Sequence, residues 1–296
     1  MAVNPSRLTE PAVYPNGPFG SSNGQTFRPT EQPVTYTLPD MELTNPAQIE
    51  RAVGQDHYHH RAYTDEASLY DSRRFTDSWG RYFNAFEQQQ IFKLLNLKPG
   101  QSVLDAPVGT GRIGAYLAQQ GLNVTGLDLT RNMMLQARRR SESANLAINF
   151  IEANARVLPF ADNQFDGLIS NRFFHIIPVE IYRPFILEMW RVLKPGGVLL
   201  VQFDSALAGG IMTQARIYYR KLVYGKRSRH FLRPGHIQEV FDGIENITLH
   251  GGLPVGMRTL HKLAPAAVPL CAKLTANGPR SFYANRLFVR AVKPSR

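Results

Sequence analysis

Short apolar runs alternate with stretches of helical periodicity through the central part of this chain. Five runs, each bounded by Gly, Pro, Asn or Asp, predict buried strands at 102–105, 123–128, 148–152, 165–170 and 198–203. Between most of them, apolar residues recur at three- and four-residue spacing, which is typical of amphipathic helices. Strands that alternate with helices indicate a largely parallel sheet covered on both faces. The pattern therefore predicts a doubly wound α/β fold.

The same spacing predicts the remaining elements. Helices are expected before, between and after the strands, at 79–97, 112–120, 130–143, 181–193 and 234–240. A Pro-Gly-Gly turn is expected between the fourth of these helices and the strand at 198–203. Two further strands are expected at 244–250 and 282–292, so the sheet should have seven.

The two ends of the chain differ in composition from this core. Residues 1–55 are dense in Pro, Asn, Gly, Ser and Thr without any period, so we expect an extended or disordered arm. Residues 56–100 predict a helical cap and residues 101–205 the ligand-binding core. Residues 206–235 predict a basic lid insertion, and 236–296 the last part of the sheet with a further substrate-side insertion.

The stretch Val103–Arg112 reads Val-Leu-Asp-Ala-Pro-Val-Gly-Thr-Gly-Arg, a strand followed by a tight loop and a helix start. Such a unit holds nucleotide-like ligands in α/β proteins, because Gly109 and Gly111 let the backbone approach the ligand. Residues 109–114 also spell G-x-G-x-x-G, with Asp128 about twenty residues further on, as in dinucleotide sites. A nicotinamide dinucleotide is therefore one candidate ligand.

Asp105 argues against that candidate. It ends the strand at the point where a dinucleotide would place its pyrophosphate, and a carboxylate repels phosphate. A carboxylate instead suits a cationic or zwitterionic ligand. S-adenosylmethionine (SAM) carries a sulfonium, an α-ammonium group and a ribose diol but no phosphate, so it fits this position better.

Three features in order along the chain strengthen this interpretation. They are Asp-x-Pro-x-Gly-Thr-Gly-Arg at 105–112, Asn-Ala followed by Leu-Pro-Phe at 154–160, and a helix with Lys-Pro-Gly-Gly at 194–197 before an apolar strand. Together they resemble the class I SAM-dependent methyltransferases, a superfamily that includes ubiquinone-type and natural-product enzymes. The resemblance implies a Rossmann-like sheet of seven strands whose last strand runs antiparallel between the fifth and sixth. It also implies SAM as cofactor and S-adenosylhomocysteine as product.

The resemblance assigns cofactor contacts to the carboxyl ends of the strands. Asp128 would accept the ribose hydroxyls, Leu129 would lie near the adenine, and the amide oxygen of Asn154 would accept from the adenine amino group. At Asn154 the family often has an acid. The full set of expected cofactor-binding residues is Asp105, Ala106, Pro107, Gly109, Gly111, Arg112, Asp128, Leu129, Asn154, Ala155, Asn171 and Arg172.

Methyl transfer from SAM needs alignment of the nucleophile and exclusion of water, and a general base only when the acceptor must lose a proton. His175 follows a strand end and is the candidate base, although a lone histidine is more often structural. Tyr70 belongs to a segment that resembles the part of these enzymes that closes over the methionine end of SAM, and with Tyr63 it would orient the acceptor. A capped helix that packs on the domain is the alternative for this segment.

Composition limits the partners without choosing among them. The chain has 296 residues, a net charge of +11 and one cysteine, so it has no internal disulfide framework. No apolar run is long enough to span a bilayer. The N-terminal residues also lack the basic segment followed by an apolar run that is typical of a signal peptide, so we expect a cytoplasmic protein. We expect no metal, because His57, His59 and His60 have no acidic or cysteine partner nearby.

Basic and aromatic residues interleave through 206–233. Such a segment suits an anionic small substrate, RNA, a membrane surface or simply a solvated face. The function predicted is SAM-dependent methylation of a small or lipid-like acceptor, including an anionic one. An RNA methyltransferase that uses 216–233 and a SAM-binding protein without methylating activity remain open, as does a homo-oligomer formed through the arm or the lid.

Overall fold

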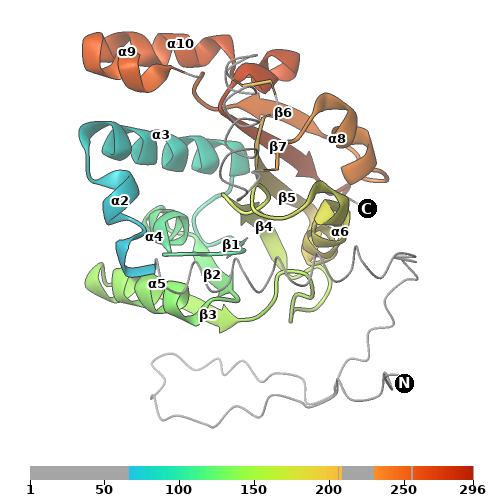
Figure 1. Cartoon of the computed structure of the whole chain (residues 1–296). Coiled ribbons are helices and arrows are strands. Elements are labelled where there is room, and N and C mark those ends of the chain that lie inside the picture. Colours follow the sequence, from blue (N-terminus) through green and yellow to red (C-terminus); the bar gives the residue numbers. More distant parts are fainter. Residues whose placement is uncertain (1–66, 206, 209–229, 255, 296) are drawn as a thin grey trace, which may run out of the picture. The chain divides into compact units, whose positions relative to one another are not determined.

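The expected strands assemble into one sheet with the order β3-β2-β1-β4-β5-β7-β6 (Figure 1). The computed structural model describes residues 67–205, 207–208, 230–254 and 256–295. All pairs from β3 to β5 are parallel, and β7 pairs antiparallel with both β5 and β6. The predicted antiparallel last strand is therefore confirmed. The strands are β1 Ser102–Asp105, β2 Asn123–Asp128, β3 Ile148–Glu152, β4 Phe165–Ser170, β5 Leu193–Asp204, β6 Thr248–Gly251 and β7 Arg286–Val292.

The α-helices are α2 Ser72–Phe75, α3 Ser78–Leu95, α4 Arg112–Gln119, α5 Arg131–Ser143, α6 Tyr182–Arg191, α8 Pro234–Val240, α9 Met257–Leu263 and α10 Val268–Leu274. Five helices, α3, α4, α5, α6 and α8, match the predicted ones, whereas α2, α9 and α10 were not among the expected helices. Short 3₁₀ turns are η1 Ala67–Leu69, η2 Val179–Ile181, η3 Pro265–Ala267 and η4 Gly278–Tyr283. The α3 helix begins at an Asp77 side chain that accepts from the Gly80 N–H, and it ends at Asn96 in the left-handed conformation.

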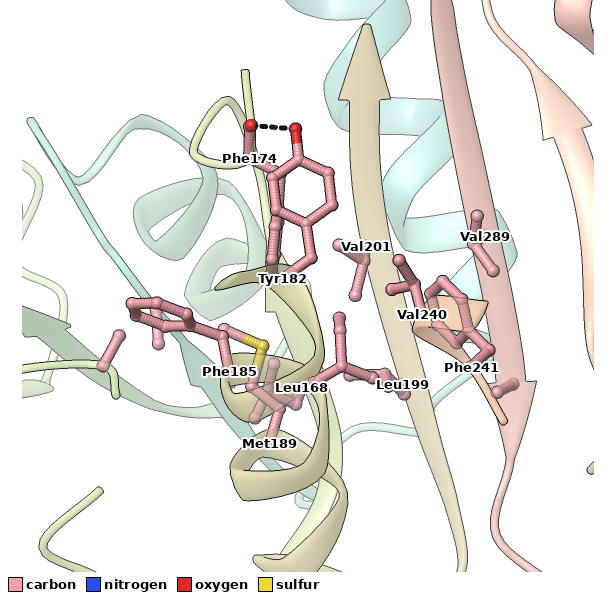
Figure 2. Close-up of a cluster of buried hydrophobic side chains, with 14 of the residues drawn as sticks. Leu168, Phe174, Tyr182, Phe185, Met189, Leu199, Val201, Val240, Phe241 and Val289 are labelled. Atoms are coloured by element: carbon pink, nitrogen blue, oxygen red, sulfur yellow. Dashed lines mark hydrogen bonds between the residues drawn. The ribbon is translucent and has the colours of Figure 1, made fainter. Parts of the chain in front are cut away.

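Alternate side chains of the central strands enter two apolar layers. In β4, Ile169 faces the layer with α3 and α4, which includes Ile91 and Leu117. Its neighbour Leu168 faces the layer with α6 and α8 (Figure 2). Strands buried on both faces give the continuous apolar runs seen in the sequence, since both faces are covered by helices.

The α6 layer also fixes the loop after β4. Tyr182 is almost fully buried, and its hydroxyl donates to the Phe174 carbonyl oxygen (Figure 2). The rings of Phe174 and Tyr182 lie 4.9 Å apart in an edge-to-face arrangement. A buried hydroxyl needs such a partner, so this bond holds the loop that leads from the sheet towards the site.

Three local predictions were wrong. Lys194–Gly197 is not a turn before the fifth strand but part of β5, where the register with β4 shifts and Gly196 has φ +78°. Such an irregularity accommodates extra residues without ending the strand. The sixth and seventh strands begin at Thr248 and Arg286, later than expected, because the residues before Arg286 form the η4 turn.

Some predictions fall outside the described residues. They are the arm at 1–55, the start of the cap at 56–66 with Tyr63 and the histidines at 57–60, and most of the basic insertion. None of the helices in the described ranges is long and apolar enough to cross a membrane.

Candidate functional site

A cavity lies at the carboxyl ends of the parallel strands, between the loops that follow β1, β2 and β4. This is the edge at which open α/β sheets bind ligands. The cavity is lined by Tyr70, Asp105, Pro107, Val108, Gly109, Thr110, Arg112, Ile113, Leu127, Asp128, Leu129, Thr130, Met133, Asn154, Ala155, Asn171, Arg172, Phe173, Ile176, Ile177 and Phe185. It therefore brings together most of the residues predicted as cofactor contacts, together with Tyr70.

The glycine loop between β1 and α4 forms one wall of this cavity. Gly109 has φ +55°, and a side chain added there would meet open space rather than protein. Gly111 has φ +73°, and an added Cβ would lie 2.8 Å from the Cβ of Ala137 in α5. Gly109 thus leaves room for a ligand against the backbone, whereas Gly111 is required by conformation and helix packing.

Asp105 lines the cavity at the end of β1 and is 2% exposed. Burial raises the pKa of its carboxyl to about 7, against the opposing effects of the Gly114 N–H and the Arg112 charge. Its Oδ2 has no hydrogen-bond partner among the described residues. A buried carboxylate oxygen without a partner is costly, so this position is suited to a bound cation.

Asp128 ends β2 and holds the glycine loop in place. Its Oδ2 accepts from the Gly109 N–H at 2.8 Å, and its Oδ1 accepts from the Thr130 N–H at 2.7 Å. A carboxylate oxygen can accept two hydrogen bonds, so one backbone N–H does not saturate it. The carboxylate is therefore oriented by backbone before any ligand binds.

Beyond Asp128 the cavity wall becomes apolar. Leu129 is 44% exposed and lines the cavity with Met133 and Ala155. The Asn154 side-chain oxygen accepts from the Arg156 N–H at 2.9 Å, which closes a local turn. An apolar surface beside one amide side chain provides stacking area and polar recognition for a flat heteroaromatic ring such as adenine.

Tyr70 lies across the cavity on the segment before α2. The guanidinium of Arg74 lies 3.9 Å from the centre of its ring, and its hydroxyl is hydrogen-bonded to the Arg172 side chain. The next residue, Asp71, pairs with Arg140 of α5 and accepts from the Thr110 hydroxyl at 3.0 Å. The Tyr70 segment is thus attached directly to the glycine loop and to α5.

A buried charge cluster adjoins the cavity beneath α3. Glu87 is 2% exposed and pairs with Arg112 and Arg172, and Arg286 of β7 contributes further positive potential. Burial alone would raise the pKa of Glu87, but the three arginines lower it to about 2. Arg286 itself pairs with Asp204. The cluster holds three guanidinium groups and two carboxylates, so its positive charges outnumber the negative ones.

Arg172 connects this cluster to the cavity that it lines. Its backbone is left-handed, with φ +59°, and its N–H donates to the buried Gln202 side chain at 2.9 Å. Its guanidinium lies near the rings of Phe75 and Phe83. Burial opposes its charge, but Glu87 and Tyr70 raise its pKa above the ordinary value. The side chain is therefore a fixed cation in the wall of the cavity.

Three of the predicted site residues do not line the cavity: Ala106, Gly111 and His175. Ala106 is fully buried behind the loop. His175 is half-buried, and its carbonyl oxygen accepts from the His230 N–H at 3.0 Å. The loop after β4 directs Asn171, Arg172 and Phe173 into the wall of the cavity instead. The predicted catalytic role of His175 thus has no geometric support from the cavity lining.

Glu87, Asp71 and Arg286 were missed by sequence reasoning. A signal for Glu87 was present, because it lies at four-residue spacing from Phe83 and Ile91 on the apolar face of its helix. An acid on such a face requires a buried cation as partner. No local pattern marked Asp71 or Arg286, whose partners are distant in sequence.

Known proteins that are similar to this chain are methyltransferases. Residues 103–197 match the family model described as a methyltransferase domain. A ubiquinone/menaquinone biosynthesis C-methyltransferase from Cereibacter sphaeroides is 32% identical over 160 residues, which are 53% of this chain and 62% of that protein. A demethylmenaquinone methyltransferase from Renibacterium salmoninarum is 41% identical over 116 residues, which are 39% of this chain and 46% of that protein.

A solved structure from Thermotoga maritima supports the fold. It is described as a SAM-dependent methyltransferase and possible histamine N-methyltransferase, is 17% identical, and has a TM-score of 0.55. The alignment covers 80% of this chain and 99% of that one. At this identity the likeness shows the fold alone. This chain spans less than two thirds of the length of the curated relatives above.

Proposed function

We propose that this chain, which belongs to the class I SAM-dependent methyltransferases, transfers a methyl group to a carbon atom of a small, lipid-like acceptor. The observation that carries the proposal is the pair of carboxylates at adjacent strand ends. Asp105 is buried in the cavity wall with an oxygen that lacks a partner, and Asp128 is oriented by two backbone N–H groups. Together they suit one cationic group and one diol on the same ligand.

The cavity fits SAM by the chemistry of its donors and acceptors. Asp105 would hold the positively charged methionine end, Asp128 the ribose, and Leu129 with Asn154 the adenine. When bound, SAM supplies an activated methyl group whose sulfur accepts the electron pair of the breaking bond. The protein then has to align the acceptor behind that methyl group and exclude water, effects that together are worth roughly 7–11 kcal/mol.

We assign Asn171 and Arg172, which were expected to contact the cofactor, to the acceptor side of the cavity, where charge and aromatic surface combine. Arg172 presents a cation beside the Tyr70 hydroxyl, and Asn171 has a side-chain oxygen without a partner among the described residues. Phe173 and Phe185 supply apolar wall, with their rings 5.2 Å apart. A hydroxylated aromatic ring suits such a wall, because Arg172 would stabilise its phenolate form, which makes the ring carbon nucleophilic. As that carbon bonds to the methyl group, the charge on the oxygen is neutralised, and loss of the proton on the same carbon to water restores the aromatic ring.

The names of the relatives suggest the same class of acceptor. The matched proteins of Cereibacter and Renibacterium are described as acting in ubiquinone or menaquinone biosynthesis and on demethylmenaquinone. A hydroquinone ring with an isoprenoid tail is a hydroxylated aromatic acceptor of lipid-like character. Its phenolic oxygen would be the anionic group that Arg172 recognises.

The test is methyl transfer from SAM that carries a deuterated methyl group to a prenylated hydroquinone. The expected product gains the labelled methyl group on a ring carbon, as shown by mass spectrometry and NMR. Asp128→Ala should weaken SAM binding at least about a hundred-fold in calorimetry, because two hydrogen bonds to a charged group are lost. Asp242→Ala removes a carboxylate that is 77% exposed and should leave both readouts unchanged.

Other outcomes would redirect the proposal. If SAM binds but no acceptor in a lipid extract gains the label, the chain is a SAM-binding protein without methylating activity. If RNA gains the label and its affinity for the chain falls steeply with salt, the acceptor is nucleic acid, because phosphate contacts release counterions. Unchanged SAM affinity in Asp128→Ala would contradict the assignment of the ribose site.

A further inference from the structure

The most exposed large apolar side chains of the described residues gather in one stretch of the chain. Leu263, Leu270, Leu274 and Tyr283 are exposed by 80%, 66%, 65% and 61%, whereas the other exposed residues of this kind lie between 41% and 46%. All four belong to α9, α10 and η4, which follow one another after β6 (Figure 1). We call the exposed side chains of residues 256–283 the α9–α10 surface.

The helices of this surface contribute little to the core. No residue of α9 is buried, and Val268 is the one buried residue of α10. A helix of seven residues has little stability of its own in water. The leucines lie on short helices that contact one another, since α9 and α10 both pack on η3 and on each other. Large apolar side chains exposed on adjoining elements point to an interaction surface.

The charge of this surface is entirely positive. Arg258, Lys262, Lys273 and Arg280 are exposed, and the chain has no Asp or Glu between Asn246 and Arg296. Arg258 pairs with Asp77 at the start of α3, which fixes α9 in place. The remaining three cations form no salt bridge with a described carboxylate. Exposed apolar side chains together with lysine and arginine, and without acids, are the composition of segments that bind anionic membrane interfaces.

The same surface connects physically to the cavity. His261 of α9 packs on Trp79 and Tyr82 of α3, with ring centres 5.6 and 4.9 Å apart. Trp79 packs on Phe83 at 5.9 Å, and the Arg172 guanidinium lies 5.2 Å from the centre of the Phe83 ring. A row of aromatic side chains thus runs from α9 to a residue that lines the acceptor side of the cavity.

We propose that the α9–α10 surface docks the protein on a bilayer of anionic lipids. Leu263, Leu270 and Leu274 would enter the boundary between headgroups and acyl chains, and Lys262 and Lys273 would contact lipid phosphates. A second copy of this chain would bring like charges together on this surface, whereas anionic lipids match both its charge and its apolar area. The inference is independent of the proposed reaction, since binding to lipid requires neither cofactor nor acceptor.

The test is cosedimentation of the full chain with phosphatidylcholine vesicles, with and without phosphatidylglycerol. We expect binding that depends on phosphatidylglycerol and weakens with salt. Leu270→Ser with Leu274→Ser should lower the partition coefficient at least about tenfold, because two apolar side chains lose their burial in lipid. Lys262→Gln with Lys273→Gln should lower it by roughly fivefold for each cation removed.

Leu135→Ser in α5 is the matched control, because Leu135 is 43% exposed and lies outside this surface. It should leave vesicle binding unchanged, and far-UV circular dichroism shows that each variant is folded. Binding that survives the leucine variants would overturn the proposal, as would a full chain that stays in the supernatant with anionic vesicles. A dimer in sedimentation velocity that the leucine variants dissociate would overturn it in favour of self-association.

Discussion

Asp105 and Asp128 end neighbouring parallel strands, yet their surroundings assign them different tasks. Asp128 accepts two backbone N–H groups, which orient its carboxylate. Asp105 is buried with an oxygen that lacks a partner among the described residues, and burial raises its pKa to about 7. The first carboxylate is therefore organised without ligand, whereas the second depends on one.

The raised pKa of Asp105 predicts a pH dependence of SAM binding. Below about pH 7 the ligand-free protein holds a proton on Asp105, and a cationic ligand must displace it. The apparent affinity for SAM should therefore rise by up to about tenfold per pH unit between about pH 5 and 7, then level off. Calorimetry across this range measures it, together with the proton released.

Asp105→Asn should bind SAM more weakly and lose this pH dependence. The same variant should stabilise the ligand-free protein at about pH 8, on the order of 2 to 4 kcal/mol, because the carboxylate that burial disfavours is gone. The sign follows from the raised pKa: the native state binds the extra proton between about pH 4 and 7, so wild-type stability falls as the pH rises through that window. A pH dependence that persists in Asp105→Asn would contradict this account.

Tyr70 and His175, the two predicted catalytic residues, differ in their position relative to the cavity. Tyr70 lines the cavity beside Arg172, and His175 does not line it. We therefore expect Tyr70→Phe to lower kcat by about ten- to a hundred-fold with little change in SAM affinity, because the role that we propose for the hydroxyl is to orient the acceptor. His175→Gln should change kcat less than threefold. Steady-state kinetics on both variants measures these changes in kcat. A larger loss of kcat in His175→Gln than in Tyr70→Phe would restore His175 as the candidate base.

At the scale of elements, the segment before α3 is attached to the glycine loop both directly and through α5. Arg138, Arg139 and Arg140 lie in the last two turns of α5, where the helix dipole favours cations. Arg138 and Arg139 are exposed, but Arg140 pairs with Asp71, and its Nε donates to the Thr110 carbonyl oxygen at 2.9 Å. Arg140 therefore joins the two walls of the cavity.

Arg140→Ala should loosen the Tyr70 segment rather than unfold the domain. Both partners of the Arg140–Asp71 pair remain about a third exposed, so the pair contributes at most about 1 kcal/mol to stability. We expect a three- to tenfold rise in the Kd for SAM, measured by calorimetry, with a Tm change of a few degrees. Arg139→Ala, on the exposed side of the same turn, should change neither quantity.

At the scale of the whole molecule, Glu87 connects elements from distant parts of the chain. It lies on α3, and its partners Arg112, Arg172 and Arg286 come from α4, the loop after β4, and β7. Glu87→Gln leaves these buried cations with less compensation and should lower the free energy of unfolding by about 3 to 5 kcal/mol. Urea unfolding at about pH 7 provides the measurement.

The lowered pKa of Glu87 determines the pH below which its carboxylate stops stabilising the protein. Its carboxylate contributes its full stability above pH 4.5, its ordinary value, and loses it as the pH falls through about 2. The stability difference between wild type and Glu87→Gln should therefore narrow only below about pH 4.5. A difference that already vanishes at about pH 6 would show that the pair does not hold the elements together.

The order of strands and helices, the glycine loop and the position of both site carboxylates were predictable from the sequence. Each depends on neighbouring residues: an apolar run sets a strand, a strand end sets the place of Asp105 or Asp128, and helical spacing sets the covering helices. The seven-stranded sheet with an antiparallel last strand followed from the resemblance that these local motifs carry. The cofactor was therefore predictable from short segments.

Only the tertiary structure decided which side chains meet. The cluster around Glu87, the attachment of Asp71 to Arg140 and the row of rings from α9 to Arg172 join residues that are far apart along the chain. Their pairing depends on how helices pack over the sheet, which no local period specifies. The exposure of the leucines in α9 and α10 also required the fold, because an apolar segment in sequence is equally typical of a buried helix. Sequence determined the chemistry of the cofactor site, and packing determined the proposed acceptor side and the surface that we propose binds lipid.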